Sequence, residues 1–224
     1  MNNNTIIITG ASRGIGFALA NIFLENGYRV IGTSRTGCID NISHKDFLSL
    51  QLDLSVPDDI KRFEKEFAAK NIQVDILINN AGVGPDLNHN LPDEDSFEQT
   101  FAVNLNGTVF FTEQMLRHIS PGGKIINISS RMGSINLCIS ADAVAYRTSK
   151  AALNMYSKIL TNRLADRYQV ATLHPGWVQT TIAGPGMQGR LTAEESASGI
   201  FTFAVSDFKH GIFWNVETGD TCDW

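Results

Sequence analysis

The residues best suited to chemistry in this sequence are a tyrosine and a lysine four positions apart, Tyr146 and Lys150. On a helix this spacing places both side chains on one face, about one turn apart. Free tyrosine has a pKa near 10, whereas an acid–base catalyst at neutral pH works best with a pKa nearer 7. An ammonium group ~4 Å from the phenolate supplies about 4 kcal/mol at an effective dielectric constant of 20, which matches this difference. The pair predicts proton transfer by Tyr146 with its pKa lowered by Lys150, although a half-buried Tyr beside a surface Lys has the same spacing.

A serine sixteen residues before Tyr146 is the second candidate group. The apolar stretch at 125–128 reads as a strand and ends in Ser129 and Ser130. A hydroxyl at the carboxyl end of a parallel strand could hydrogen-bond a substrate carbonyl. The alternative, equally compatible with the spacing, is a serine that caps the following turn.

A glycine-rich turn follows the first expected strand, in the sequence T-G-A-S-R-G-I-G at 9–16. Gly10 suits a tight turn, Gly14 allows the backbone to approach a pyrophosphate, and Gly16 permits close packing of helix on strand. The helix that follows presents free N–H groups and a partial positive charge to phosphates. The position of this turn predicts dinucleotide binding, and a packing turn without a ligand is the alternative.

The segment after the second expected strand indicates which dinucleotide is bound. Folds that prefer NAD place an acidic residue about 20 residues after the glycines, to bind the ribose hydroxyls. Residues 30–36 contain no acid and include Arg35, while Arg13 lies within the glycine turn. Two guanidinium groups suit the 2′-phosphate of NADP, so NADP(H) is favoured over NAD(H). Two solvated surface arginines are the alternative.

Strand-like and helical segments alternate along the chain and must position these groups. Strands are expected at 5–9, 28–33, 47–52, 74–78, 124–129, 170–174 and 212–216, and helices after the glycine turn and at 56–70, 96–119, 144–167 and 192–205. Ser55 is the expected N-cap of the helix at 56–70, with Pro57 in its first turn. Apolar strands that alternate with helices predict a doubly wound, Rossmann-type parallel α/β sheet of about seven strands, with helices on both faces. We expect a single domain over residues 1–224.

The ordered set of motifs resembles the short-chain dehydrogenase/reductase family over essentially the whole chain. The set comprises residues 9–16, the N-N-A-G sequence at 79–82, Asn104, Ser130, the Y-x-x-x-K pair and the dipeptide Pro175-Gly176. Within that family, residues 129–135, 145–150, 174–178 and 215–224 are similar to Sniffer-type carbonyl reductases and to bacterial C-factor proteins.

The resemblance implies a role for each matching residue. Tyr146 is the acid–base group, Lys150 lowers its pKa and binds the nicotinamide ribose, Ser130 holds the substrate oxygen, and Asn104 anchors a water that links Lys150 to solvent. The residues implied in cofactor binding are Gly10, Ser12, Arg13, Gly14, Ile15, Gly16, Arg35, Asp53, Leu54, Asn80, Ala81, Gly82, Tyr146, Lys150, Pro175, Gly176, Val178 and Thr180. The short segment 181–190 corresponds to the family's variable substrate loop, which implies an open pocket.

Composition and charge exclude several other classes of protein. A net charge of −5 argues against a nucleic-acid-binding protein, and no apolar run approaches the ~18 residues of a membrane span. The first residues do not read as a secretory signal, and three dispersed cysteines fit a reducing cytoplasm. No metal site is expected, because the five histidines lack ligand spacing.

The sequence therefore predicts an NADP(H)-dependent carbonyl reductase or alcohol dehydrogenase that acts on a small-molecule substrate. The alternative is a dinucleotide-binding signalling or redox-sensor protein of the C-factor type, although a sensor has no physical need of Tyr146. A nucleotide-sugar epimerase is disfavoured, because no further substrate domain follows. Apolar side chains on several faces of the helices at 96–119 and 144–167 predict a homo-oligomer, a dimer or tetramer, with core packing as the alternative.

Overall fold

A computed structural model describes residues 4–182 and 188–224 of the chain. The strands of the sheet are β1 (Thr5–Ile8), β2 (Arg29–Ser34), β3 (Phe47–Gln51), β4 (Val74–Asn79), β5 (Ile119–Ile128), β6 (Gln169–His174), β7 (Ile212–Asn215) and β8 (Asp220–Thr221). The helices are α1 (Gly14–Glu25), α2 (Pro57–Ala68), α3 (Glu94–Phe101), α4 (Thr108–Met115), α5 (Val144–Leu164) and α6 (Ala193–Val205). A π-helix, η1 (Ala102–Gly107), joins α3 to α4, and two 3₁₀ turns are η2 (Leu116–His118) and η3 (Arg131–Gly133).

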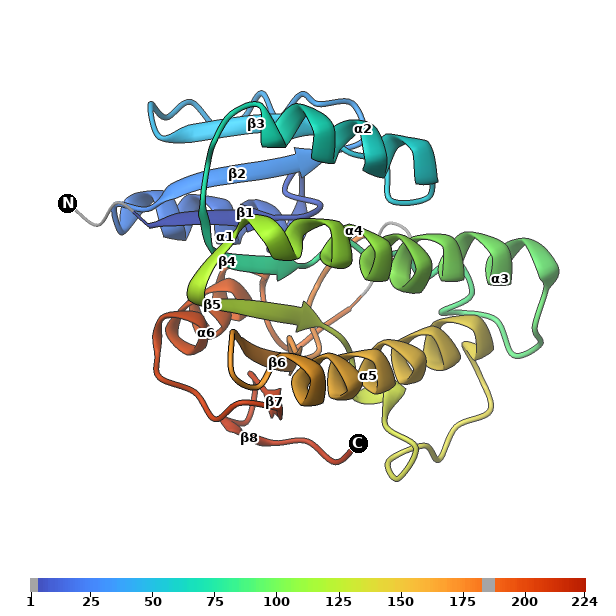
Figure 1. Ribbon diagram of the computed structural model, residues 1–224. Coiled ribbons are helices and arrows are strands. Elements are labelled where there is room, and N and C mark those ends of the chain that lie inside the picture. The colour runs from blue at the N-terminus through green and yellow to red at the C-terminus, as the bar shows by residue number, and fades with distance from the viewer. Residues whose placement is uncertain (1–3, 183–187) are drawn as a thin grey trace.

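The strands form one sheet in the order β3-β2-β1-β4-β5-β6-β7-β8, with every neighbouring pair parallel except β7 and β8. The chain moves outward in one direction from β1 to β3 and in the other from β4 to β7, so the strand order reverses between β1 and β4 (Figure 1). In open α/β sheets, ligands bind at the carboxyl ends of the strands beside such a reversal. The expected doubly wound fold is confirmed.

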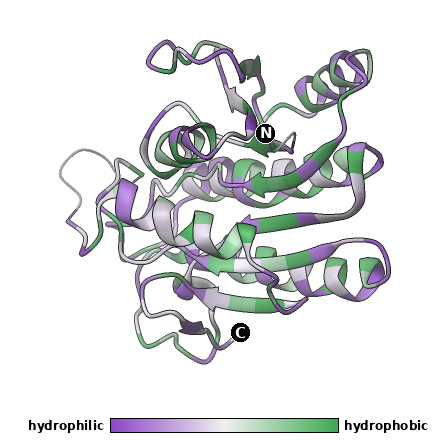
Figure 2. Cartoon of the chain, turned by 90° about the vertical axis from the view of Figure 1, so that its left-hand side faces the viewer, coloured by the Kyte–Doolittle hydropathy of each residue, from purple (hydrophilic) through white to green (hydrophobic). Residues whose placement is uncertain are grey.

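Two apolar cores lie on opposite faces of the sheet, because successive strand residues point to opposite sides. Ile6 and Ile8 pack with α1 and α6, whereas Ile7 packs with α2, α4 and α5. Figure 2 shows apolar residues concentrated along the central strands and hydrophilic residues in the surrounding loops. Both faces of the sheet are therefore covered, which leaves its carboxyl edge as the place for polar side chains.

Three details differ from the sequence-based expectations. The sheet has eight strands among the described residues, because the exposed two-residue strand β8 pairs antiparallel with β7 and carries no apolar pattern. Ser55 is not the N-cap of α2: Val56 holds that position, and the Ser55 hydroxyl donates to Asp53 instead. The helix expected at 96–119 is divided by η1 and ends at Met115.

Within residues 4–182 and 188–224, no helix combines the length and the apolar character that a membrane crossing requires.

Candidate active site

The glycine turn between β1 and α1 has the backbone geometry that a dinucleotide needs. Gly10 has a φ of +68°, and a Cβ there would lie 3.0 Å from the Ala81 Cα. A Cβ on Gly16 would lie 2.3 Å from the Gly10 carbonyl oxygen, so only glycine fits. Gly14, with a φ of +55°, faces open space whose nearest atom is Cγ2 of Thr180, 4.0 Å away. Two glycines thus close the turn, and the third leaves room on the side that faces Thr180.

The N-terminus of α1 lies at this open space. Arg13 occupies the N-cap position in an extended conformation, no described side chain caps the helix, and its first turn contains no acidic residue. In contrast, α2, α3 and α6 each carry two acids in their first turn. The free N–H groups and the helix dipole make this end suitable for a phosphate anion.

The N-N-A-G segment after β4 is joined directly to the glycine turn. The Thr9 hydroxyl accepts hydrogen bonds from the backbone N–H groups of Asn80 and Ala81, both at 3.0 Å. The Asn80 side-chain amide donates to the Thr9 carbonyl at 2.9 Å. These bonds hold β1 and β4 together at the reversal of strand order, where the sequence placed the ribose contact.

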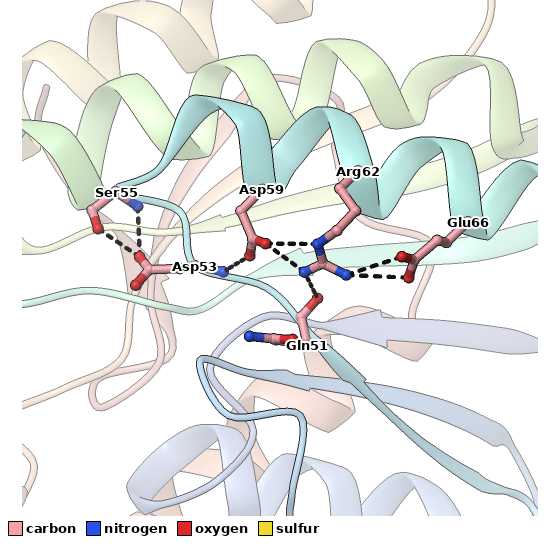
Figure 3. Close-up of polar contacts among 6 residues, drawn as sticks. All are labelled: Gln51, Asp53, Ser55, Asp59, Arg62 and Glu66. Carbon is pink, nitrogen blue, oxygen red and sulfur yellow. Dashed lines mark hydrogen bonds and ion pairs between the residues drawn. The ribbon is translucent and has the colours of Figure 1, made fainter.

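The opposite end of the site, after β3, is fixed by a polar network on α2 (Figure 3). The Asp53 carboxylate accepts from both the backbone N–H and the hydroxyl of Ser55, at 2.9 and 2.6 Å. The Asp53 backbone N–H donates to the Asp59 carboxylate at 2.6 Å, and Arg62 forms ion pairs with both Asp59 and Glu66. The loop that carries the expected adenine contacts, Asp53 and Leu54, is therefore held rigidly by side chains that the sequence reading had not connected.

The two arginines expected at the 2′-phosphate are both exposed. Neither Arg13 nor Arg35 forms an ion pair with any residue that the structure describes. Ser34, just before Arg35, is buried, and its hydroxyl donates to the Cys38 carbonyl. Both guanidinium groups therefore remain available to an anion.

Asn104 lies on the π-helix η1, where the wider turn directs it at the loop after β4. Its side chain clamps the Val83 backbone, accepting from the N–H and donating to the carbonyl, both at 2.8 Å. The amide also donates to the Ser149 hydroxyl at 3.2 Å. A Cβ on Gly82 would lie 3.4 Å from the Asn104 Oδ1 and 3.6 Å from the Lys150 Nζ. The Asn104 side chain and the Lys150 ammonium group thus both lie beside Gly82. A π-helical turn within an α-helix, such as η1, is frequently found at functional sites.

Tyr146 and Lys150 lie in the first turns of α5, as the spacing predicted, and both are buried. The Lys150 Nζ lies 5.7 Å from the centroid of the Tyr146 ring and donates to the Ile128 carbonyl at 2.9 Å. Burial lowers the pKa of Lys150 to about 8. The pKa of Tyr146 is raised to about 12, chiefly by burial; a polar contact with the Ser130 hydroxyl lowers it, and the negative charge of Asp86 makes the smallest contribution, which raises it. The expectation that the pKa of Tyr146 is lowered is wrong for this structure, because the ammonium group points to a carbonyl and desolvation dominates.

The two serines after β5 have different environments. The buried Ser129 hydroxyl donates to the Asn154 Oδ1 at 2.6 Å, which is a structural contact. The Ser130 hydroxyl accepts from the backbone N–H of Met132 at 3.1 Å and so caps η3. The hydrogen of the Ser130 hydroxyl is not used by this bond and can donate to a ligand. Ser130 therefore has the capping role that the sequence offered as one alternative, and its role in holding a substrate oxygen stays a prediction.

The segment after β6 is held by Glu217, which the sequence analysis missed. Its carboxylate accepts from the backbone N–H of Trp177 at 3.1 Å and pairs with Arg190 at 2.6 Å. The Arg190 guanidinium in turn lies over the Trp177 ring, 5.5 Å from its centroid. Burial raises the pKa of Glu217, but the Trp177 N–H and Arg190 together hold it below its ordinary value. No short-range pattern indicates this contact, since about 40 residues separate Glu217 from Trp177.

Pro175 and Gly176, for which the family resemblance implies cofactor contacts, lie beside this contact. The Pro175 carbonyl accepts from the Ser196 hydroxyl of α6 at 2.7 Å, and Gly176 has a φ of +95°. Of the expected substrate segment 181–190, residues 183–187 lie outside the described part of the chain. Across the described residues, no three His, Cys, Asp or Glu side chains gather as metal ligands would.

Comparison with known proteins agrees with this geometry. Residues 4–190 match the family model for short chain dehydrogenase. An oxidoreductase of Schizosaccharomyces pombe is 32% identical over 194 residues, which span 83% of this chain and 64% of that protein. The C-signal protein of Myxococcus xanthus is 39% identical over 132 residues, which span 57% of this chain and 78% of that protein. The chain belongs to the short-chain dehydrogenase/reductase family of oxidoreductases.

Solved structures of the family superpose on nearly the whole chain. A short-chain dehydrogenase/reductase of Burkholderia multivorans with bound NADP has a TM-score of 0.87 at 28% identity, covering 99% of this chain and 100% of that chain. The carbonyl reductase Sniffer of D. melanogaster has a TM-score of 0.86 at 26% identity, and each chain is covered completely. The expected similarity to Sniffer-type reductases and to C-factor proteins is confirmed.

Proposed function

We propose that this protein is an NADP(H)-dependent oxidoreductase that interconverts a small-molecule carbonyl compound and its alcohol, with Tyr146 as the acid–base group. The observation that carries the proposal is the meeting of Tyr146, Ser130 and Lys150 at the carboxyl edge of the sheet, beside the reversal of strand order. That position adjoins the glycine turn, so a dinucleotide bound there reaches the same three side chains.

The residues around the glycine turn fit NADP(H). Gly10, Gly14 and Gly16 provide the close backbone approach, and the uncapped N-terminus of α1 suits the pyrophosphate. Arg13 and Arg35 would hold the 2′-phosphate, which makes NAD(H) the less favoured cofactor. Further contacts are proposed for Ser12, Ile15, Asp53, Leu54, Asn80, Ala81, Gly82, Pro175, Gly176, Val178 and Thr180. When bound, NADPH supplies the hydride equivalent for carbonyl reduction, and NADP⁺ adds a positive charge near the phenol.

The high pKa of Tyr146 keeps the phenol protonated, as a proton donor must be, and at the same time makes it a weaker acid than free tyrosine. A phenol with a pKa of about 12 is neutral at pH 7 and can donate its proton to the oxygen of a carbonyl under reduction. Ser130 would hold that oxygen, since the bond from Met132 leaves the hydroxyl hydrogen for donation. Lys150 would bind the nicotinamide ribose and, with Asn104, return a proton to the phenol from solvent. The chemistry needs no metal.

Apolar side chains around the site favour a carbonyl compound with an apolar body. Leu91, Ile135, Leu137, Ile139 and Trp177 are exposed, at 79%, 78%, 37%, 97% and 49% respectively. They lie on the loops that follow β4, β5 and β6, at the sheet edge that holds Tyr146. Exposed apolar groups on the loops at one edge of a sheet are typical of a ligand-binding surface.

The proposal is tested with purified protein, NADPH and a panel of aldehydes, ketones, aliphatic diketones and quinones. We expect NADPH oxidation with apolar diketones or quinones, faster than with NADH, and no change on addition of EDTA. Tight binding of NADPH without oxidation by any member of the panel would contradict reductase activity. That outcome would favour a signalling or redox-sensor function, which the similarity to C-signal brings forward.

We also propose that the protein is a cytoplasmic homo-oligomer, a dimer or tetramer. Phe110 on α4 and Met155 and Ile159 on α5 are apolar side chains that are more than half exposed, at 60%, 63% and 53%. A second copy could cover this surface. All three cysteines are free, which suits a reducing compartment.

A further inference from the structure

The N-terminus of α5, which carries Tyr146, lacks the usual local cap. The N-cap residue is Ala143, whose methyl side chain cannot accept a hydrogen bond, and its backbone is left-handed with φ and ψ of 52° and 49°. The first N–H groups of a helix have no partner within the helix, and a buried N–H left unpaired is costly. Some other group must therefore satisfy the start of α5.

Asp86, from the turn after β4, supplies that partner. Its carboxylate accepts from the backbone N–H of Ala145 at 2.7 Å and from that of Tyr146 at 3.2 and 3.3 Å. These are the second and third residues of the helix, the positions that an N-cap side chain normally serves. Asp86 is 1% exposed, and no cationic side chain among the described residues pairs with it. The helix N-terminus is thus the sole described partner of the buried carboxylate.

The turn that carries Asp86 also packs directly on the tyrosine. The His89 N–H donates to the Asp86 carbonyl at 2.8 Å, and the His89 carbonyl accepts from the Ala143 N–H at 2.9 Å. A Cβ on Gly84 would lie 3.0 Å from Cδ2 of the Tyr146 ring, so the backbone of the turn is in contact with the ring. Backbone bonds, the carboxylate and this contact all connect the turn to the first turn of α5.

We propose that Asp86 is a positioning residue for Tyr146: its carboxylate holds the first turn of α5, and with it the tyrosine, in place, and its negative charge acts on the phenol from that position. This inference rests on the role proposed above for Tyr146. Replacing the charge with a neutral amide should make the phenol more acidic, since the negative charge of Asp86 is a cause that raises the pKa of Tyr146. Keeping the hydrogen-bond acceptor should preserve the geometry.

The other polar groups around Tyr146 do not account for the contribution of Asp86 that raises the pKa of the phenol. Lys150 lies on the same helix, and Ser130 approaches from η3 and lowers the pKa of Tyr146. The nearby Asp142 is neutralised by its ion pair with Arg147 at 2.7 Å, and Asp93, which lies 3.6 Å from His89, is exposed to solvent. Of the acidic groups around Tyr146, Asp86 is buried and pairs with no cationic side chain among the described residues.

Positioning is tested by amide hydrogen exchange at Ala145 and Tyr146 in Asp86→Ala and Asp86→Asn. A helix cap changes the local opening equilibrium by about 2- to 30-fold, so exchange at these two amides should accelerate by that factor in Asp86→Ala. Asp86→Asn should exchange like the parent, because one amide oxygen can take the place of the Oδ2 that both N–H groups approach. Unchanged exchange in Asp86→Ala would overturn the positioning role.

The effect of the charge is tested by NMR titration of protein labelled with ¹³C at the tyrosine Cζ, over the pH range in which the fold persists. The chain has four tyrosines, and Tyr146→Phe identifies the Tyr146 resonance. In Asp86→Asn this resonance should move toward its phenolate position at a lower pH than in the parent. Asp93→Asn is the matched control, since Asp93 caps α3 by the same kind of bond, to Ser96 at 2.8 Å. Identical titration of the parent and Asp86→Asn would overturn the proposed effect of the charge.

Kinetics separate this inference from the proposed function. With NADPH and 2,3-hexanedione, Asp86→Ala should lower kcat by about 10- to 100-fold and leave the KM for NADPH nearly unchanged, because misplacement of a reacting group affects the chemical step. Unchanged kcat in an active parent would contradict the inference alone. If the parent and the whole carbonyl panel are inactive, the proposed function fails, while the exchange and NMR readouts still decide what Asp86 does.

Discussion

Arg35 carries the most specific claim about an individual residue, the choice of cofactor. A charge-assisted hydrogen bond to the 2′-phosphate contributes roughly 1.5–3 kcal/mol, which corresponds to about 10- to 150-fold in affinity. Arg35→Ala should weaken NADPH binding by that order and leave NADH nearly unchanged, because NADH has no 2′-phosphate. Titration of both cofactors by fluorescence measures this directly.

Arg29→Ala is the matched control for this experiment. Arg29 lies exposed at the opposite end of β2, so its removal changes the net charge equally but lies away from the proposed phosphate site. Equal losses for NADH and NADPH in Arg35→Ala, or a parent that prefers NADH, would refute the assignment.

Lys150 makes the stability of the protein depend on pH. Its pKa falls from 10.5 to about 8 on burial, so below pH 8 the folded protein must keep a buried charge, and this lowers its stability. Between pH 8 and 10.5 the folded state releases this proton while the unfolded chain keeps it, so the penalty diminishes as pH rises. The difference between the two pKa values sets an upper bound of ~3 kcal/mol on the penalty.

Lys150→Met should therefore be more stable than the parent at pH 7, by about 2 kcal/mol once the lost hydrogen bond to Ile128 is subtracted. The advantage should shrink steadily between pH 8 and 10.5. Urea denaturation at several pH values measures both quantities. A difference that does not depend on pH would show that Lys150 has no such burial penalty.

At the scale of single residues, the types and positions of the catalytic candidates were predictable from sequence, but their electrostatics were not. Tyr146, Ser130 and Lys150 meet as the motif order implied. The direction in which the pKa of Tyr146 is shifted was not predicted from sequence. The shift depends on burial and on Asp86, which lies 60 residues before Tyr146 in the chain. Helical spacing shows that a lysine is near a tyrosine and does not show where its ammonium group points.

Among the structural elements, the connection after β6 is held in part by the side chain of Glu217. Glu217 accepts a hydrogen bond from the Trp177 N–H and forms an ion pair with Arg190. The Glu217 side chain is 15% exposed and the Arg190 side chain is 59% exposed. Glu217→Ala removes both contacts and should cost about 1–2 kcal/mol, whereas Arg190→Ala removes the half-exposed ion pair and the contact with the Trp177 ring and should cost about 0.5–1 kcal/mol.

Because Pro175 and Gly176 adjoin this contact, Glu217→Ala should also raise the KM for NADPH more than Arg190→Ala does. Urea denaturation and steady-state kinetics measure the two effects. Lys61→Ala, which removes an exposed ion pair with Asp58 on α2, is the control and should change neither. Equal effects from Glu217→Ala and Arg190→Ala would mean that the bond to the Trp177 backbone contributes no more than the contact of Arg190 with the Trp177 ring.

The structural elements themselves were predictable except where tertiary contacts decide them. The helix expected at 96–119 has continuous helical periodicity, yet it widens into η1 at Ala102–Gly107. A Cβ on Gly107 would lie 2.1 Å from the Leu54 carbonyl oxygen, so the close approach of the loop after β3 accompanies this distortion. Ser55 follows the local rule for an N-cap, but the Asp53 carboxylate offers its hydroxyl and N–H a nearer partner.

For the whole molecule, the alternation of strands and helices was sufficient to predict the architecture. Parallel strands joined by helices have right-handed crossovers, and a chain that winds outward from the middle in both directions gives the order observed. The antiparallel β8 was missed because a two-residue exposed strand leaves no period in the sequence. The same architecture brings residues from the turn after β1, from η1, from the start of η3 and from α5 to one edge of the sheet.

The central claim is that this edge transfers a hydride from NADPH to a carbonyl carbon while Tyr146 donates a proton to the oxygen. The most direct measurement uses NADPH deuterated at C4, each diastereomer separately, with an apolar diketone as substrate. We predict that one diastereomer transfers deuterium to the new carbinol carbon, that EDTA has no effect, and that Tyr146→Phe binds NADPH normally but reacts 10²- to 10⁴-fold more slowly. A product alcohol without deuterium from either diastereomer, or near-full activity in Tyr146→Phe, would contradict the account.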